Sequence, residues 1–139
     1  MKNQKTVASL TTAAFLVLAG SAQAKGYNLT TGTAVTKGKA NAAGTVTFPT
    51  AKSFHVKGTV NDICPKDGYG AYIEFKINFV GGGYARTVRK DTDKCKAAAN
   101  HYNFGRGFSH KIKSIGVTLI EIDADTDAIG DAARKLIRR

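Results

Sequence analysis

The chain has 139 residues, with 21 basic side chains against ten acidic ones and a formal charge of +11. This length favours one domain and leaves no room for separate cofactor and substrate domains. The composition, with 42% hydrophobic residues and two cysteines, excludes an intrinsically disordered chain and a zinc ribbon, and no segment approaches the roughly 20 apolar residues that a membrane span needs. It does not indicate a reaction.

Residues 1–24 have the three-part pattern of a secretory signal peptide. Lys2 and Lys5 precede a short apolar run, and the small residues Ala22 and Ala24 stand at −3 and −1 of a cleavage site after Ala24. The leader holds two basic residues and no acidic one, so cleavage would leave 115 residues with a formal charge of +9. We therefore expect a secreted, extracellular protein whose residues 25–139 form a single domain.

The two cysteines, Cys64 and Cys95, are predicted to form one disulfide in an oxidising compartment. The closed loop of 32 residues would stabilise the fold by about 3.7 kcal/mol in the chain-entropy treatment. A reactive or metal-binding pair is the alternative, but neither cysteine lies in a CxxC motif or beside a histidine.

The first half of the domain is predicted to form short strands at 33–37, 45–48 and 53–60, because it is rich in Thr, Val and Gly. In the third strand the alternation of apolar residues directs His55 away from the core. Residues 71–79 then alternate strictly between apolar and polar side chains, which is typical of a strand with one buried face. Gly81-Gly82-Gly83 permits a tight reversal, so residues 71–90 are predicted to form a β-hairpin.

The second half of the domain gives three further expectations. Residues 91–108 are expected to form a long loop, with room for one helical turn at Ala97–Ala99. Residues 111–122 are expected to form a central strand that is either apolar on both faces or shifted by a bulge near Ser114 or Gly116. From Asp125 the apolar residues recur with helical spacing, which predicts a short C-terminal α-helix. The sequence thus predicts a mostly antiparallel β-sandwich of about six or seven strands with a short C-terminal helix.

Charge is distributed unevenly along the sequence. Residues 25–60 carry five lysines and no acid, residues 86–113 carry eight bases and two acids, and residues 114–131 carry five acids and no base. If the two basic segments lie side by side, they form a positive surface suited to an anionic polymer such as a cell-wall polymer, polysaccharide or nucleic acid. The candidate binding face comprises Lys57, Tyr72, Lys76, Tyr84, Arg86, Arg89, Lys111 and Lys113. The alternative is that these lysines solubilise the sheet and protect its edges.

The sequence leaves two other functions open. A small ribonuclease-like hydrolase could use Glu74 with His55 or His110, because such chemistry needs a base, an acid and a cation near a phosphate. An antimicrobial or toxin role would place the basic C-terminal helix on a membrane. No spacing fixes a catalytic group of residues, so the sequence favours a binding or structural protein.

Asp123, Asp125 and Asp127 resemble the opening of an EF-hand calcium loop. The pattern then departs from that loop, since Ala128 replaces the glycine at position six and Arg134 replaces the glutamate at position twelve. A strand end and helix cap explain the same aspartates, and calcium binding of another kind stays open. No cofactor is predicted.

Residues 54–72, with the pattern V-x-G-T-V-x-D…DG-x-x-A-Y, and the segment Asp91-Thr-Asp-Lys-Cys95 carry a resemblance to a known group. They resemble small exported β-sandwich proteins of Gram-positive bacteria, especially actinobacteria. The resemblance covers about 40 residues and implies a sandwich architecture. It implies no activity, and the C-terminal segment is not part of it.

Overall fold

The computed structural model describes residues 22–32, 39–63, 69–91, 99–123 and 129–139. Its strands, in chain order, are β1 (Lys25–Thr30), β2 (Lys39–Thr50), β3 (Ser53–Ile63), β4 (Tyr69–Phe79), β5 (Tyr84–Asp91), β6 (Asn100–Gly107), β7 (Ile112–Asp123) and β8 (Ile129–Arg138). Four strands form sheet A in the order β1-β2-β3-β6, and four form sheet B in the order β5-β4-β7-β8. All neighbouring strands are antiparallel.

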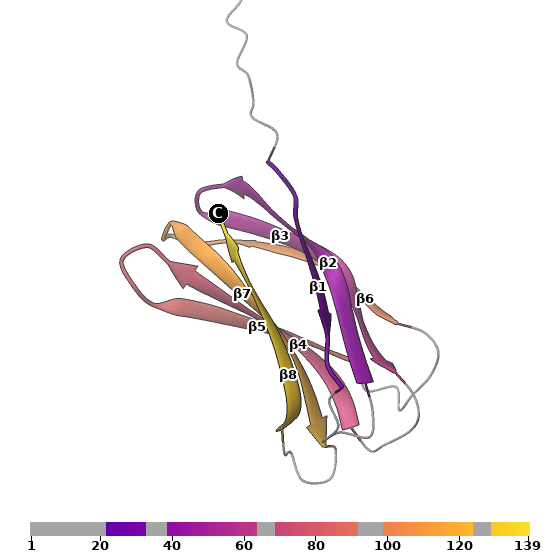
Figure 1. Ribbon diagram of the computed structural model, residues 1–139. Helices are drawn as coiled ribbons and strands as arrows, with labels where there is room; N and C mark the ends of the chain where they lie inside the picture. The colour runs from indigo at the N-terminus through magenta and orange to yellow at the C-terminus, as the bar shows by residue number, and fades with distance from the viewer. Residues whose placement is uncertain (1–21, 33–38, 64–68, 92–98, 124–128) are drawn as a thin grey trace, which may run out of the picture.

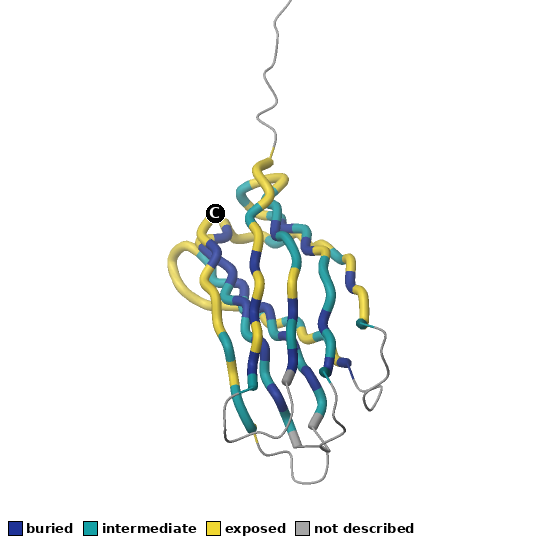
Figure 2. The backbone as a smooth tube through the Cα atoms, turned by 45° about the vertical axis from the view of Figure 1, so that its right-hand side comes forward, coloured by how far each residue is buried: buried dark blue, intermediate teal, exposed yellow. Residues whose placement is uncertain are grey.

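The two sheets pack face to face as a β-sandwich (Figure 1). β1 lies against β8, β2 against β7, β3 against β4, and β6 against β5. Burial alternates along the strands, as expected when one face of each sheet lines a shared core (Figure 2). The strictly alternating segment of β4 supplies the centre of that core, where Ala71, Ile73, Phe75 and Ile77 are completely buried.

Two tyrosines cross the inner face of sheet A. Tyr27 on β1, Gly44 on β2, Gly58 on β3 and Tyr102 on β6 form one row of paired residues. The two glycines leave room for the tyrosine rings, whose hydroxyl groups hydrogen-bond to each other across the sheet. Phe75 of sheet B packs edge-on against both rings, with ring centroids 6.1 Å from Tyr27 and 5.7 Å from Tyr102. We call Tyr27, Gly44, Gly58 and Tyr102 the tyrosine row.

The predicted β-sandwich and the β4–β5 hairpin are confirmed, with a positive φ at Gly81, Gly82 and Gly83 in the turn. His55 lies on the outer face, as expected. β7 is a central strand, as expected. Its apolar pattern results both from a register shift and from apolar side chains on both faces. A register shift opposite Asn78 and Phe79 brings Ile112 into the core, while Ile120 and Ile122 stand on the other face from Leu119. The segment predicted at 33–37 falls within residues that the structure does not describe.

Three expectations are corrected. The described residues contain eight strands rather than six or seven, and β1 was not anticipated. Part of the expected 91–108 loop is β6, which pairs with β3 because its inward residues Tyr102 and Phe104 reach the core. The predicted C-terminal helix is wrong, because Ile129–Arg138 is strand β8. β8 gives β7 its second hydrogen-bonding neighbour, and that pairing outweighs a helical pattern of about three turns that is marginal in isolation.

Candidate functional site

The outer face of sheet B carries four residues of the predicted binding face. Tyr72 and Lys76 on β4 point outward, as do Tyr84 and Arg86 on β5. Their positions follow from the hairpin register, in which Lys76 pairs with Arg86 and Tyr72 pairs with Lys90. Lys90 therefore belongs to this group, although the sequence analysis did not include it.

The remaining four predicted residues lie elsewhere. Arg89 has the opposite parity on β5 and leans over the rim of the sandwich toward β6. Lys57 lies on the outer face of sheet A, on the opposite side of the molecule. Lys111 and Lys113 belong to the end of the sandwich where β7 begins. The predicted binding face is therefore not one surface. Its residues are divided among the outer face of sheet B, the rim beside β6, the outer face of sheet A and the end of the sandwich where β7 begins.

The edge where β5 meets β6 gathers cations from three strands. Arg89 lies over the ring of Phe104, 4.3 Å from its centroid, and Arg106 lies over Phe108 at 5.2 Å. Asn100 donates a hydrogen bond of 2.7 Å to the Lys90 carbonyl and joins the two strands at this edge. We call five residues the cationic edge: Lys76, Arg86, Arg89, Lys90 and Arg106.

Aromatic rings hold these cations in place. Lys76 Nζ is 4.3 Å from the centroid of Tyr84, the Arg86 guanidinium is 5.6 Å from the same ring, and Lys90 Nζ is 4.9 Å from that of Tyr72. A cation over an aromatic ring is attracted by the ring quadrupole and loses some of its conformational freedom. Each cation of the edge therefore has a neighbouring ring that limits its positions.

An acidic side chain, Glu74, also lies at this edge, with its Oε2 3.5 Å from Arg86 Nε. Lys76 and Arg86, by contrast, are directly opposite on paired strands, an arrangement of like charges that destabilises a sheet. Among the described residues, Glu74 and the buried Asp91 at the end of β5 do not neutralise five cations, so the edge has excess positive charge. An anion bound there would relieve this repulsion.

The residues proposed for a hydrolase are not brought together. Glu74 is on the outer face of sheet B and His55 on the outer face of sheet A, so two sheets about 10 Å apart separate them. His110 packs at 5.8 Å against Phe79, five residues beyond Glu74 on β4. At about 3.4 Å per residue, Phe79 is roughly 17 Å from Glu74 along β4. The structure thus offers no shared cleft for Glu74 and either histidine.

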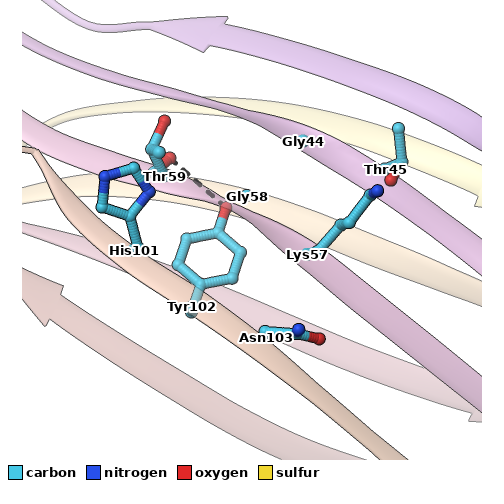
Figure 3. Close-up of a pocket in the computed structure, with 8 residues that line it drawn as sticks. All are labelled: Gly44, Thr45, Lys57, Gly58, Thr59, His101, Tyr102 and Asn103. Atoms are coloured by element: carbon cyan, nitrogen blue, oxygen red, sulfur yellow. Dashed lines mark hydrogen bonds between the residues drawn. The ribbon is translucent and has the colours of Figure 1, made fainter.

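The outer face of sheet A has a shallow hollow of about 460 Å³ (Figure 3). Its lining consists of Gly44, Thr45, Lys57, Gly58, Thr59, His101, Tyr102 and Asn103. The Tyr102 hydroxyl donates to the Thr59 carbonyl at 3.4 Å, so this ring is held from within the sheet. The surface of the hollow is mainly apolar, with Lys57 and His101 among its lining residues, and it lies on the opposite face from the outer surface of sheet B.

Several carboxylates lie at the end of the sandwich where β3, β5 and β7 finish and β8 begins. Glu121, 1% exposed, accepts a hydrogen bond from the Thr31 hydroxyl through Oε1, while its buried Oε2 has no hydrogen-bond partner. Asp91 accepts from the Asp62 backbone N–H at 3.1 Å, and Asp131 accepts from the Gly32 N–H at 3.1 Å. Within the described ranges, no three His, Cys, Asp or Glu side chains are grouped to hold a metal ion.

Several sequence predictions fall on residues outside the described ranges. These are the side chain of Asp123, the whole of Asp125 and Asp127, and both cysteines, Cys64 and Cys95. The calcium site and the disulfide therefore remain predictions. The described part of the chain has no helix long and apolar enough to cross a membrane.

Comparison of the chain with protein-family models, curated proteins and solved structures finds no match.

Proposed function

We propose that this is an exported protein that binds an anionic polymer along the cationic edge. The observation that carries the proposal is the positioning of five cations from β4, β5 and β6 over aromatic rings, with Glu74 as their acidic neighbour. A positioned guanidinium keeps in-plane N–H groups available for the oxygens of a phosphate, sulfate or carboxylate. The edge is extended along the strands, which suits a linear ligand with repeated charges.

The aromatic rings favour recognition of charge over recognition of bases. Binding of a single strand through its bases requires open aromatic faces on which the bases can stack. Tyr72, Tyr84, Phe104 and Phe108 each have a cation over the ring instead. The sequence predicts Tyr72 and Tyr84 as members of the binding face. We now assign the rings to holding the cations that contact the polymer.

Export is the second part of the proposal. It rests on the leader pattern of residues 1–24 and on the predicted Cys64–Cys95 disulfide, which requires an oxidising compartment. β3 and β6 are neighbours, with Val60 opposite Asn100, so Cys64 follows a paired position by four residues and Cys95 precedes one by five. The predicted bridge would therefore join the segment after β3 to the segment before β6.

The test measures binding of heparin and of an oligothymidylate to the purified chain as salt concentration increases. Five contacting cations give a slope of log affinity against log salt of about −3.5 for a single-stranded polyanion. The double variant Arg86→Ala/Arg89→Ala should bind more weakly and have a slope shallower by about 1.4. Heparin and the oligonucleotide should respond alike, because neither is recognised through bases.

The control is Arg134→Ala/Lys135→Ala on β8, the strand at the opposite edge of sheet B. It removes the same charge from exposed positions, so it accounts for the effect of net charge alone. Equal loss of binding in both double variants would mean that the cationic edge is not the site. Salt-independent binding would contradict the polyanion mechanism altogether.

A further inference from the structure

A second positive surface lies at the end of the sandwich that contains the β4–β5 turn. We call six residues there the basic end: Lys25, Lys52, Lys111, Lys113, Arg138 and Arg139. The described carboxylates lie elsewhere, since Glu74 is midway along β4 and Asp62, Asp91, Glu121 and Asp131 are near the opposite strand ends. None of these six cations belongs to the cationic edge, and the two surfaces adjoin at Tyr84 of the β4–β5 hairpin.

Backbone hydrogen bonds join the segments of the basic end. Phe108 N–H donates to the Lys52 carbonyl at 2.8 Å, Val80 N–H to the Lys111 carbonyl at 2.9 Å, and Arg139 N–H to the Lys113 carbonyl at 3.3 Å. Lys25 Nζ donates to the Arg138 carbonyl at 2.6 Å. The cations are therefore carried by a connected framework and do not project from independent loops.

The β4–β5 turn adds exposed apolar side chains to this surface. Val80 and Tyr84 are 55% and 56% exposed on either side of three glycines with positive φ. A Cβ at any of these glycines would have no neighbour within 4 Å, so the turn projects into solvent. Beneath it, Phe79 packs against Phe108 at 5.0 Å, which gives the turn an ordered base.

We propose that the basic end docks on an anionic lipid surface, with the β4–β5 turn entering the interfacial layer. This goes beyond polymer binding, because a soluble polyanion offers nothing to Val80, whereas a bilayer places an apolar layer directly behind its charged one. Tyrosine is favoured at that boundary because its ring is apolar and its hydroxyl is polar. The cations of the basic end would contact headgroups around the inserted turn.

The chain contains no tryptophan, so one introduced residue reports on its own environment. In Val80→Trp the fluorescence should shift to shorter wavelength with vesicles of phosphatidylglycerol and phosphatidylcholine, and not with phosphatidylcholine alone. The matched control is Ile129→Trp, because Ile129 is 67% exposed and begins β8 at the opposite end. The control should show no shift with either vesicle.

A second measurement uses vesicle sedimentation of the otherwise natural chain. Lys111→Ala/Lys113→Ala should reduce partitioning onto the anionic vesicles about 30-fold, since each basic residue near such a surface contributes about fivefold. Arg134→Ala/Lys135→Ala should reduce it much less. Heparin affinity of the Lys111→Ala/Lys113→Ala variant should stay near that of the parent, which separates this proposal from the cationic edge.

Three results would overturn the proposal: no shift in Val80→Trp, an equal shift in Ile129→Trp, or equal sedimentation with zwitterionic vesicles. If the introduced tryptophan unfolds the chain, Val80→Ser replaces it. That variant should sediment less with anionic vesicles while binding heparin normally, and unchanged sedimentation would again refute insertion of the turn.

Discussion

Replacing Gly58 by alanine tests whether the tyrosine row determines the stability of sheet A. A Cβ at this position would lie 2.7 Å from the Tyr27 hydroxyl and 2.8 Å from the Tyr102 hydroxyl, and would also meet the Ala43 carbonyl. These contacts are closer than real Cβ contacts, and one partner is backbone. The tyrosine rings must therefore move, and β3 must shift away from β2.

The expected cost combines two effects. Overpacking of a well-filled core costs about 1–3 kcal/mol, and losing the hydrogen bond between the tyrosines adds about 1 kcal/mol. We therefore expect Gly58→Ala to lower the free energy of unfolding by about 2–4 kcal/mol. At roughly 4 °C per kcal/mol for a domain of this size, the melting temperature should fall by about 8–16 °C.

The assay is thermal unfolding followed by circular dichroism, with Gly107→Ala as the control. Gly107 is also in a strand of sheet A, but a Cβ there would have no neighbour within 4 Å. Its substitution should change stability by less than about 0.5 kcal/mol. Equal melting temperatures for the two variants would refute the packing argument, because both lose the same glycine flexibility.

Two further predictions concern pH and redox state. Burial raises the pKa of Tyr102 to about 12, whereas an unfolded tyrosine ionises near pH 10. Stability should therefore be fully present below about pH 10 and fall as pH rises toward 12, and a denaturant midpoint unchanged over that range would contradict the expectation. Reductant should lower the melting temperature through loss of a bridge worth about 3.7 kcal/mol, whereas Cys64→Ser/Cys95→Ser should be insensitive to it. Free thiols in the untreated protein would show that the bridge is absent.

The hairpin was the most predictable part of the fold and of the site. Alternation through residues 71–79 sets the face of each β4 side chain, and the glycine turn sets the register with β5. Tyr72, Lys76, Tyr84 and Arg86 could therefore be assigned to one face from the sequence. The same register places Lys90 beside Tyr72, so the sequence contained the signal for that residue as well.

β6 and β8 could not be predicted because their structure depends on distant partners. β6 has glycines and asparagines with weak strand preference, and it forms because β3 offers an edge and the core accommodates two of its rings. Arg106 was missed for this reason, since its neighbour Phe108 is positioned through tertiary contacts. In β8, Ile137 is buried while Leu136 is 55% exposed, a division that helical spacing did not anticipate.

The tyrosine row also determines when sheet A can be completed during folding. Its two hydroxyl groups belong to residues 75 positions apart in the chain, on the first and the sixth strand. Contacts between such distant residues form slowly, because a long loop must close before they become favourable. β1 itself can pair with β2 early, because Thr30 and Asn41 are only eleven positions apart, but the bond between the two tyrosine hydroxyl groups must wait for β6. The buried Tyr27 hydroxyl therefore gains its partner only after six of the eight described strands have been synthesised, so the inner face of sheet A is completed late although its first hairpin is local.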